Sequence, residues 1–218
     1  MAEVRYLINN FDFRDMQVYV SASSGMLDRP KLKPLQKMDW PDYHGEVVDF
    51  KNMRYEAREI TLNCFMTAEN KLDFTWKLSE FLNIVSGRYS GVEDTQRLTI
   101  IIDPDYPLVY EVYIDSAITI NKRWNDDLMV GTFTLKFREP EPMKTVIKST
   151  SRDIYINCHS QKSFNIYWGD GNKEEDLHGD VYINHRYPWD ETFYAIITGV
   201  IEDVTYFSTN GMIIWNGL

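Results

Sequence analysis

The sequence predicts a mainly β protein, with an N-terminal β-sandwich or split barrel that carries one α-helix and with a small C-terminal β-sandwich. Three observations lead to this fold class. Fourteen Tyr, eleven Phe and six Trp among 218 residues are an aromatic content that suits half-buried strands. Apolar and polar residues alternate with period two through much of the chain, which is typical of strands with one buried face. One stretch of the N-terminal part has helical spacing instead.

The first 20 residues predict two short strands. The alternating apolar positions are Val4, Tyr6 and Ile8, and then Met16, Val18 and Val20. Asn9 and Asn10 interrupt the alternation between them.

Residues 21–45 predict a long loop or arm. Pro30, Pro34 and Pro41 make a regular strand or helix improbable there. Its apolar residues, which need a covering surface, are Leu27, Leu32, Leu35, Met38 and Trp40. The arm can pack on its own domain or on a neighbouring subunit, and the sequence leaves both alternatives open.

The strand pattern returns at residues 46–66 and then changes period. One strand face carries Ile60, Leu62, Cys64 and Met66. Beyond it, apolar residues recur at spacings of three and four: Phe74, Leu78, Phe81, Leu82 and Val85. This stripe predicts a helix over about 68–86, with Thr67 as the N-cap and Gly87 as the C′ residue.

Residues 97–138 predict further strands. We expect a hairpin of 98–102 and 109–114 around a turn at 103–107, a strand at 117–121 and an acidic turn at 125–127. In the last strand Phe133, Leu135 and Phe137 share one face.

The run Glu139-Pro140-Glu141-Pro142 predicts a boundary between two domains, 1–142 and 143–218. In the second domain we expect short strands at 153–157, 163–168, 181–187, 193–199, 203–208 and 211–215. Its core is expected to be mainly aromatic: Phe164, Tyr167, Trp168, Tyr187, Trp189, Tyr194, Phe207 and Trp215.

The clearest motif is Trp168-Gly169-Asp170-Gly171 at a strand end, followed by His185-Arg186-Tyr187. The glycines allow positive φ, and Asp170 can bond neighbouring amides, so the motif predicts a tight turn. The combination resembles the polycystic-kidney-disease-type repeat, a small immunoglobulin-like β-sandwich, over roughly 147–218. Pro188-Trp189-Asp190 departs from that family, which usually has a Pro and a Gly near each other there. The resemblance implies that these residues are structural: Trp168, Gly169, Asp170, Gly171, His185 and Tyr187.

Two metal-site hypotheses concern the same region, and neither has the residue pattern that such a site requires. Asp170, Glu174, Glu175 and Asp176 lack the alternating spacing of a calcium loop. His178 and His185 lack a third ligand for a transition metal.

Catalytic machinery is not evident either. Ser23-Ser24-Gly25 lacks the setting of a nucleophile elbow, and there is no phosphate-binding glycine loop. The histidines, His44, His159, His178 and His185, have no carboxylate at a recognisable spacing. We therefore expect a protein that is not an enzyme, with no catalytic, cofactor-binding or metal-binding residues.

Residues 1 to about 140 resemble the N-terminal domain of distal tail proteins of long-tailed bacteriophages. The resemblance lies in the order of elements, in the Tyr55-x-x-Arg58-x-Ile60-x-Leu62 strand before the helix, and in the last strand ending Arg138-Glu139-Pro140. It implies a hexameric ring that joins the tail tube to the baseplate, with other tail tube and baseplate proteins as partners. The resemblance also implies a variable C-terminal domain that projects outward, in an active phage or a prophage. The edge strands and the loop at 21–45 are the expected subunit contacts.

Charge and composition limit the other partners. The net charge of −10 repels nucleic acid and anionic membranes, so neither sequence-specific nucleic acid binding nor membrane binding is expected. No apolar run approaches the ~20 residues of a membrane helix. The N-terminal residues do not have the pattern of a signal peptide, so synthesis in the bacterial cytoplasm is expected. Cys64 and Cys158 are expected to be buried free thiols.

An alternative function remains open from the residues. The C-terminal domain could bind a surface glycan or protein through exposed aromatics such as Trp189 or Trp215. The competing interpretation is that these two side chains are ordinary aromatic residues of the core.

Overall fold

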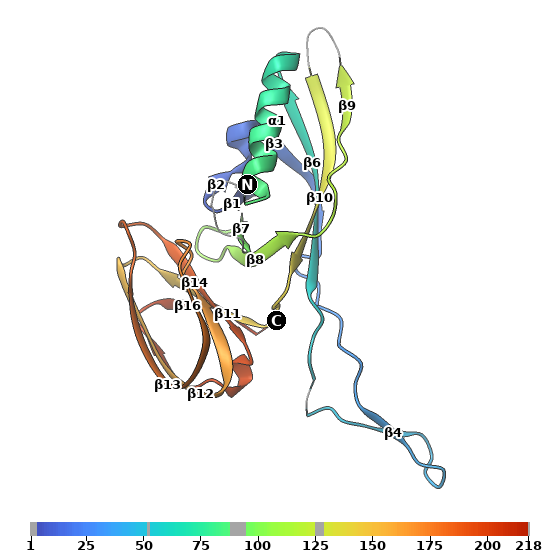
Figure 1. Ribbon diagram of the computed structural model, residues 1–218, viewed down its shortest axis with the longest axis vertical. Coiled ribbons are helices and arrows are strands. Elements are labelled where there is room, and N and C mark those ends of the chain that lie inside the picture. Colours follow the sequence, from blue (N-terminus) through green and yellow to red (C-terminus); the bar gives the residue numbers. More distant parts are fainter. Residues whose placement is uncertain (1–3, 52, 88–94, 125–128, 218) are drawn as a thin grey trace.

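The computed structural model describes residues 4–51, 53–87, 95–124 and 129–217, and these form a mainly β molecule with one α-helix. The predicted fold class is confirmed. Figure 1 shows an N-terminal body with the helix on it, a C-terminal unit beside its lower part, and a long arm that extends away from both. Within the described ranges, no helix has the length and apolar character that a membrane crossing requires.

The N-terminal body is one antiparallel sheet that folds over on itself. Its strands are β1 (Arg5–Ile8), β2 (Phe11–Asp12), β3 (Val18–Ser24), β6 (Arg58–Ala68), β7 (Gln96–Ile101), β8 (Leu108–Ile114), β9 (Asn121–Trp124) and β10 (Met129–Glu139). They follow the order β2-β1-β7-β8-β10-β6-β3, and β9 also pairs with β10. The first part of β8 pairs with β7, whereas its last two residues pair with β10. Strand β8 therefore connects two layers, and the main core lies between them.

The core of the body follows the alternation in its long strands. In β6 the residues Ile60, Leu62, Cys64 and Met66 are buried, and in β10 so are Phe133, Leu135 and Phe137. Helix α1 (Lys71–Val85) buries Phe74, Phe81 and Val85 against them. The ring of Phe81 lies edge-on to Phe13 of the 3₁₀ helix η1 (Phe13–Met16), with 5.0 Å between centroids. The predicted strand faces and helix stripe are confirmed.

The start of α1 differs from the prediction. Thr67 lies inside β6, and Asn70 is the N-cap because its side chain accepts a hydrogen bond from the Asp73 amide at 2.9 Å. Strand pairing with β10 extends to Ala68 and keeps Thr67 extended. At the other end Gly87 has φ +75°, as expected of a C′ glycine.

Two other expectations for the body need correction. No strand forms at 117–120, because pairing with β10 begins only at Asn121 in β9. The expected acidic turn at 125–127 lies outside the described residues.

The arm covers residues 26–57 and is not wholly irregular. Strand β4 (Lys37–Asp39) pairs with β5 (Glu46–Val48) in a small separate sheet near its tip. The expectation that 21–45 holds no regular strand is therefore wrong, since β3 also runs to Ser24. Only three residues pair on each side, and Pro34 and Pro41 lie outside β4.

The C-terminal unit, residues 144–217, is a second antiparallel sheet wrapped around its own core. Its strands are β11 (Lys144–Ser149), β12 (Asp153–Tyr167), β13 (Lys173–Arg186), β14 (Phe193–Gly199), β15 (Thr205–Thr209) and β16 (Met212–Gly217), and the 3₁₀ helix η2 spans Ile201–Asp203. The strands expected at 153–157 and 163–168 are one strand, β12, with register shifts between Ser160 and Ile166. Its first half pairs with β15 and its second half with β14, so the strand bends from one layer to the other.

The aromatic core expected for this unit is correct for three residues. Phe164, Trp168 and Tyr187 are buried, whereas Tyr167, Tyr194, Phe207 and Trp215 are half-buried and Trp189 is exposed. Most of the remaining core is aliphatic, with Ile147, Ile154, Ile156, Ile166 and Ile197. Cys64 and Cys158 are buried free thiols, and burial raises the pKa of Cys64 to about 12.

The hairpin of β7 and β8 lies between the two units and is buried on both faces. Leu98, Ile100, Tyr110 and Val112 belong to the core of the body. On the other face, Val109 packs with Val146 and Ile196 of the C-terminal unit. The polar residues of the hairpin are buried as well: Gln96, Arg97, Thr99 and Glu111.

Candidate functional site

Asp170 is the centre of the turn that the sequence motif predicts. Its carboxylate accepts hydrogen bonds from the backbone and side-chain amides of Asn172, both at 3.0 Å, and from His185 Nε2 at 2.8 Å. The side chain of Asp170 is only 1% exposed. Burial by itself raises its pKa, but the bonds from Asn172 and His185 outweigh burial and hold the pKa of Asp170 below its ordinary value.

The aromatic residues of the motif stack around His185. Its ring lies parallel to Trp168 with centroids 4.5 Å apart and edge-on to Tyr187 at 4.9 Å. The Tyr187 hydroxyl donates to the Trp168 carbonyl at 3.1 Å. The structure thus brings together the six residues singled out from the sequence, and their role in stability stays a prediction.

Gly169 makes room for a residue that the sequence did not single out. Its φ is +95°, and a Cβ there would lie 2.6 Å from Nη1 of Arg97. Arg97, in β7, forms an ion pair with Glu111 and donates to the carbonyls of Tyr194 and Tyr167. It therefore fastens the C-terminal unit to the body. No local pattern marks Arg97, because its partners are distant in sequence.

Two histidines contact carboxylates, although the sequence shows no carboxylate at a recognisable spacing from either of them. His159 Nδ1 lies 2.8 Å from Asp180 on the exposed side of β12 and β13, and His185 bonds Asp170. The first pair spans the neighbouring strands β12 and β13, and the second joins the turn between these strands to β13, so sequence spacing could not show either pair. In the described residues, no group of three or more His, Cys, Asp or Glu side chains is placed to hold a metal ion.

The arm presents a row of apolar side chains to solvent. The exposed ones are Leu27, Leu32, Met38, Trp40, Tyr43, Val47, Phe50 and Met53. These side chains are exposed in the single chain, whereas Leu35 of the same segment is half-buried. Large apolar surfaces that are exposed to solvent commonly mark interaction sites.

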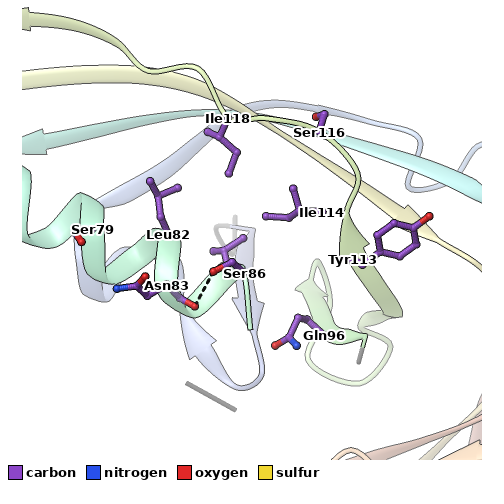
Figure 2. Close-up of a pocket in the computed structure, with 10 residues that line it drawn as sticks. Ser79, Leu82, Asn83, Ser86, Gln96, Tyr113, Ile114, Ser116 and Ile118 are labelled. Atoms are coloured by element: carbon purple, nitrogen blue, oxygen red, sulfur yellow. Dashed lines mark hydrogen bonds between the residues drawn. The ribbon is translucent and has the colours of Figure 1, made fainter. Parts of the chain in front are cut away.

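One hollow lies between the C-terminal end of α1 and the hairpin strands, and Figure 2 shows its lining. It is about 580 Å³ and is lined mainly by hydroxyl, amide and aliphatic groups, among them Ser79, Leu82, Asn83 and Ile118. The Ser86 hydroxyl donates to the Asn83 carbonyl at 3.2 Å. These groups include no acid–base pair.

A second hollow, of about 490 Å³, lies where the motif turn meets the body. Its lining includes Asn10, Arg97, Gly171, Asn172 and Trp189. Trp189 is 54% exposed. An exposed indole beside amide groups is a chemistry that can bind a sugar ring.

Comparisons with known proteins bear on the whole chain. Residues 14–138 match the model of the phage tail protein RIFT-related domain. No curated protein matches the sequence. The chain is similar to the crystal structure of the SPP1 Dit protein, described as a paradigm of the hub adsorption apparatus in Gram-positive infecting phages. The two share 12% identity with a TM-score of 0.50, over 95% of this chain and 97% of that one. At this identity the likeness concerns the fold.

Proposed function

Because the chain belongs to the family of phage tail proteins with the RIFT-related domain, we propose that it is a distal tail protein that forms a homo-oligomeric ring, a hexamer, joining the tail tube to the baseplate. The observation that carries this proposal is the arm with its exposed apolar side chains. Tail tube and baseplate proteins are the proposed partners, and the virion tail is the proposed location.

The arm supports the proposal because its surface needs a cover that its own chain does not supply. The two sides of the arm bond each other near its base, where the Lys33 amide donates to the Arg54 carbonyl at 2.8 Å and the Glu56 amide to the Lys31 carbonyl at 2.7 Å. These backbone hydrogen bonds hold the two sides of the arm together, so the arm can contact a neighbouring subunit as one unit. The neighbouring-subunit alternative is the one that this geometry favours.

The edges of the body sheet support a ring rather than a two-fold dimer. Strand β3 lies at one end of the strand order, and β9 lies on the other side of β10. Two different edges suit a head-to-tail contact, and head-to-tail contacts form a ring when the rotation between subunits closes. An exposed strand edge otherwise invites uncontrolled pairing.

Light scattering of the full chain across a range of concentrations tests the ring. A mass six times that of the 25.7 kDa chain is expected. A monomer at high concentration, with no ring in any isolated tail complex, would contradict the proposal.

We also propose that residues 1–142 and 143–218 are separate domains and that the second is a polycystic-kidney-disease-type sandwich. The separate core clusters of body and C-terminal unit support the division. The contacts of Asp170, His185 and Tyr187 support the family.

A second candidate function is glycan binding by the C-terminal unit, favoured by Trp189 at the second hollow. Trp215 is a poorer platform, because it packs against both the body core and the contact between the units. Binding of the full chain to a glycan array, lost in Trp189→Ala and kept in Tyr182→Ala, is expected for this function. Tyr182 is a comparably exposed aromatic away from that hollow. Silence of the array, or equal loss in both variants, would remove the candidate.

A further inference from the structure

Four buried side chains meet where the arm leaves the body and where the C-terminal unit begins. They are Arg58 at the start of β6, Tyr110 in β8, Glu139 at the end of β10 and Lys144 at the start of β11, and we call them the junction cluster. None is more than 3% exposed. Buried charges are rare unless they are paired, so their partners define what the cluster does.

Glu139 holds the two cations of the cluster together. One carboxylate oxygen forms an ion pair with the Lys144 ammonium, and the other lies 3.2 Å from Arg58 Nε. The Lys144 nitrogen also lies 3.9 Å from the centroid of the Tyr110 ring, a cation–π contact. Removing one partner leaves a buried charge uncompensated, which destabilises strongly. The positions of Arg58, Tyr110 and Lys144 therefore depend on one another.

The same cluster clamps the base of the arm. The Met26 carbonyl, where the arm leaves, accepts hydrogen bonds from Arg58 Nη1 at 2.9 Å and from the Tyr110 hydroxyl at 2.7 Å. Arg58 is itself the first residue after the arm returns. The outgoing end of the arm thus bonds Arg58 and Tyr110, and the returning end leads directly into Arg58. Arg58 in turn contacts Glu139, and Tyr110 contacts Lys144.

A direct link between arm and C-terminal unit also exists but is weak. Arg54 Nη1 lies 3.7 Å from Oε1 of Glu202 in η2, and both side chains are about half exposed. Exposed ion pairs of this kind contribute roughly 0–1 kcal/mol. The junction cluster, which is buried, is the stronger connection.

We propose that the junction cluster couples the base of the arm to the start of the C-terminal unit, so that a change in the mobility of either one changes that of the other. The coupling goes beyond the proposed ring: an arm seated on a neighbouring subunit holds the C-terminal unit of its own chain in a defined orientation. Its biological use rests on the arm being the subunit contact. The coupling itself is a property of one chain.

Hydrogen exchange by mass spectrometry on the full chain tests the coupling through two variants that touch opposite sides of the cluster. Lys144→Met removes the charge from the C-terminal side, and Tyr110→Phe removes the hydroxyl that bonds Met26. We expect Lys144→Met to speed exchange at the arm base, residues 26–33 and 54–58. We expect Tyr110→Phe to speed exchange in β11. A coupling of the usual size predicts about fivefold or more in each case, and coupling is reciprocal.

Arg138→Met is the matched control. Arg138 precedes Glu139 in β10 and pairs with Asp115 at 3.1 Å, but that pair is exposed. Exchange at both the arm base and β11 should stay unchanged in this variant.

Two outcomes would overturn the proposal. Exchange that rises only beside each substitution shows that the two sides are independent. Exchange that rises uniformly, α1 included, shows that the cluster holds the whole fold and does not link two parts. Failure of the ring is a separate result, because exchange is measured within single chains and ring formation by mass.

Discussion

At the residue scale, the C-terminal motif combines a buried, hydrogen-bonded Asp170 with aromatic rings, of Trp168 and Tyr187, that pack around its partner His185. Asp170 is buried, yet it receives three hydrogen bonds from Asn172 and His185. Buried polar groups that are fully bonded order their surroundings, and an unbonded one destabilises. The turn therefore depends on the charge of Asp170 and not only on its size.

Asp170→Asn should lower the free energy of unfolding by about 2 kcal/mol at pH 7, because hydrogen bonds to a charged group are lost. The pKa of Asp170 lies below its ordinary value of 3.8 in the folded protein, so its stabilisation is present above that value and is lost as the pH falls through the lower folded pKa. Chemical denaturation from pH 7 to pH 3 should show the difference between variant and parent shrinking below about pH 4.

Asp180→Asn is the control for this prediction. Asp180 lies 2.8 Å from His159, the same distance as in the Asp170–His185 pair, but its side chain is 96% exposed. Stability should be unchanged in this variant. Equal effects of the two substitutions would show that the buried network does not stabilise the turn.

At the scale of the element, α1 shows how a helix start is chosen. Thr67 and Asn70 are both residue types that cap helices. Thr67 is held in β6 by its pairing with Val130, so the chain turns only three residues later. The long strand thereby determines where the helix begins.

Asn70→Ala should lower the free energy of unfolding by about 1 kcal/mol, because the Asp73 amide loses its acceptor. Thermal denaturation measures the change, and faster exchange of the Asp73 amide locates it. Asn70→Asp keeps the acceptor and should retain the stability of the parent. If Asn70→Asp were as destabilised as Asn70→Ala, the hydrogen bond would not be the cause.

At the scale of the whole molecule, the arm and the junction cluster belong to one arrangement. The arm exposes apolar side chains far from the body, and its base is clamped by buried charges next to the C-terminal unit. In the proposed ring, these contacts at the base would limit the directions that the arm can take.

The proposed ring predicts that Trp40→Ser weakens subunit association, because Trp40 is 58% exposed on the arm that we propose as the subunit contact. Trp76, on the outer side of α1, is 57% exposed and makes Trp76→Ser a matched control. Light scattering should show that the Trp40 variant dissociates at a concentration at least tenfold higher than the parent does. A tenfold change corresponds to a loss of roughly 1.4 kcal/mol of association free energy per contact. An equal shift of the dissociation concentration in both variants would mean that the arm contributes no more to subunit association than the outer side of α1 does.

The sequence by itself determined which faces of the long strands and of α1 are buried, because alternation and helical spacing report which side of an element is buried. The faces of β6 and β10, the stripe of α1 and the turn at Trp168-Gly169-Asp170-Gly171 were all predictable in this way. The motif residues were also found, since glycine and aspartate mark a turn through their own backbone chemistry.

Only the tertiary structure decided which distant groups meet. Arg97 and the junction cluster were missed, because their charges sit in strands whose alternation looks ordinary and their partners lie far away along the chain. The merged strand β12 was missed because its bend depends on β14 and β15 pairing with different halves. Whether the arm packs on its own body was likewise decided in space, since the same apolar residues suit either surface.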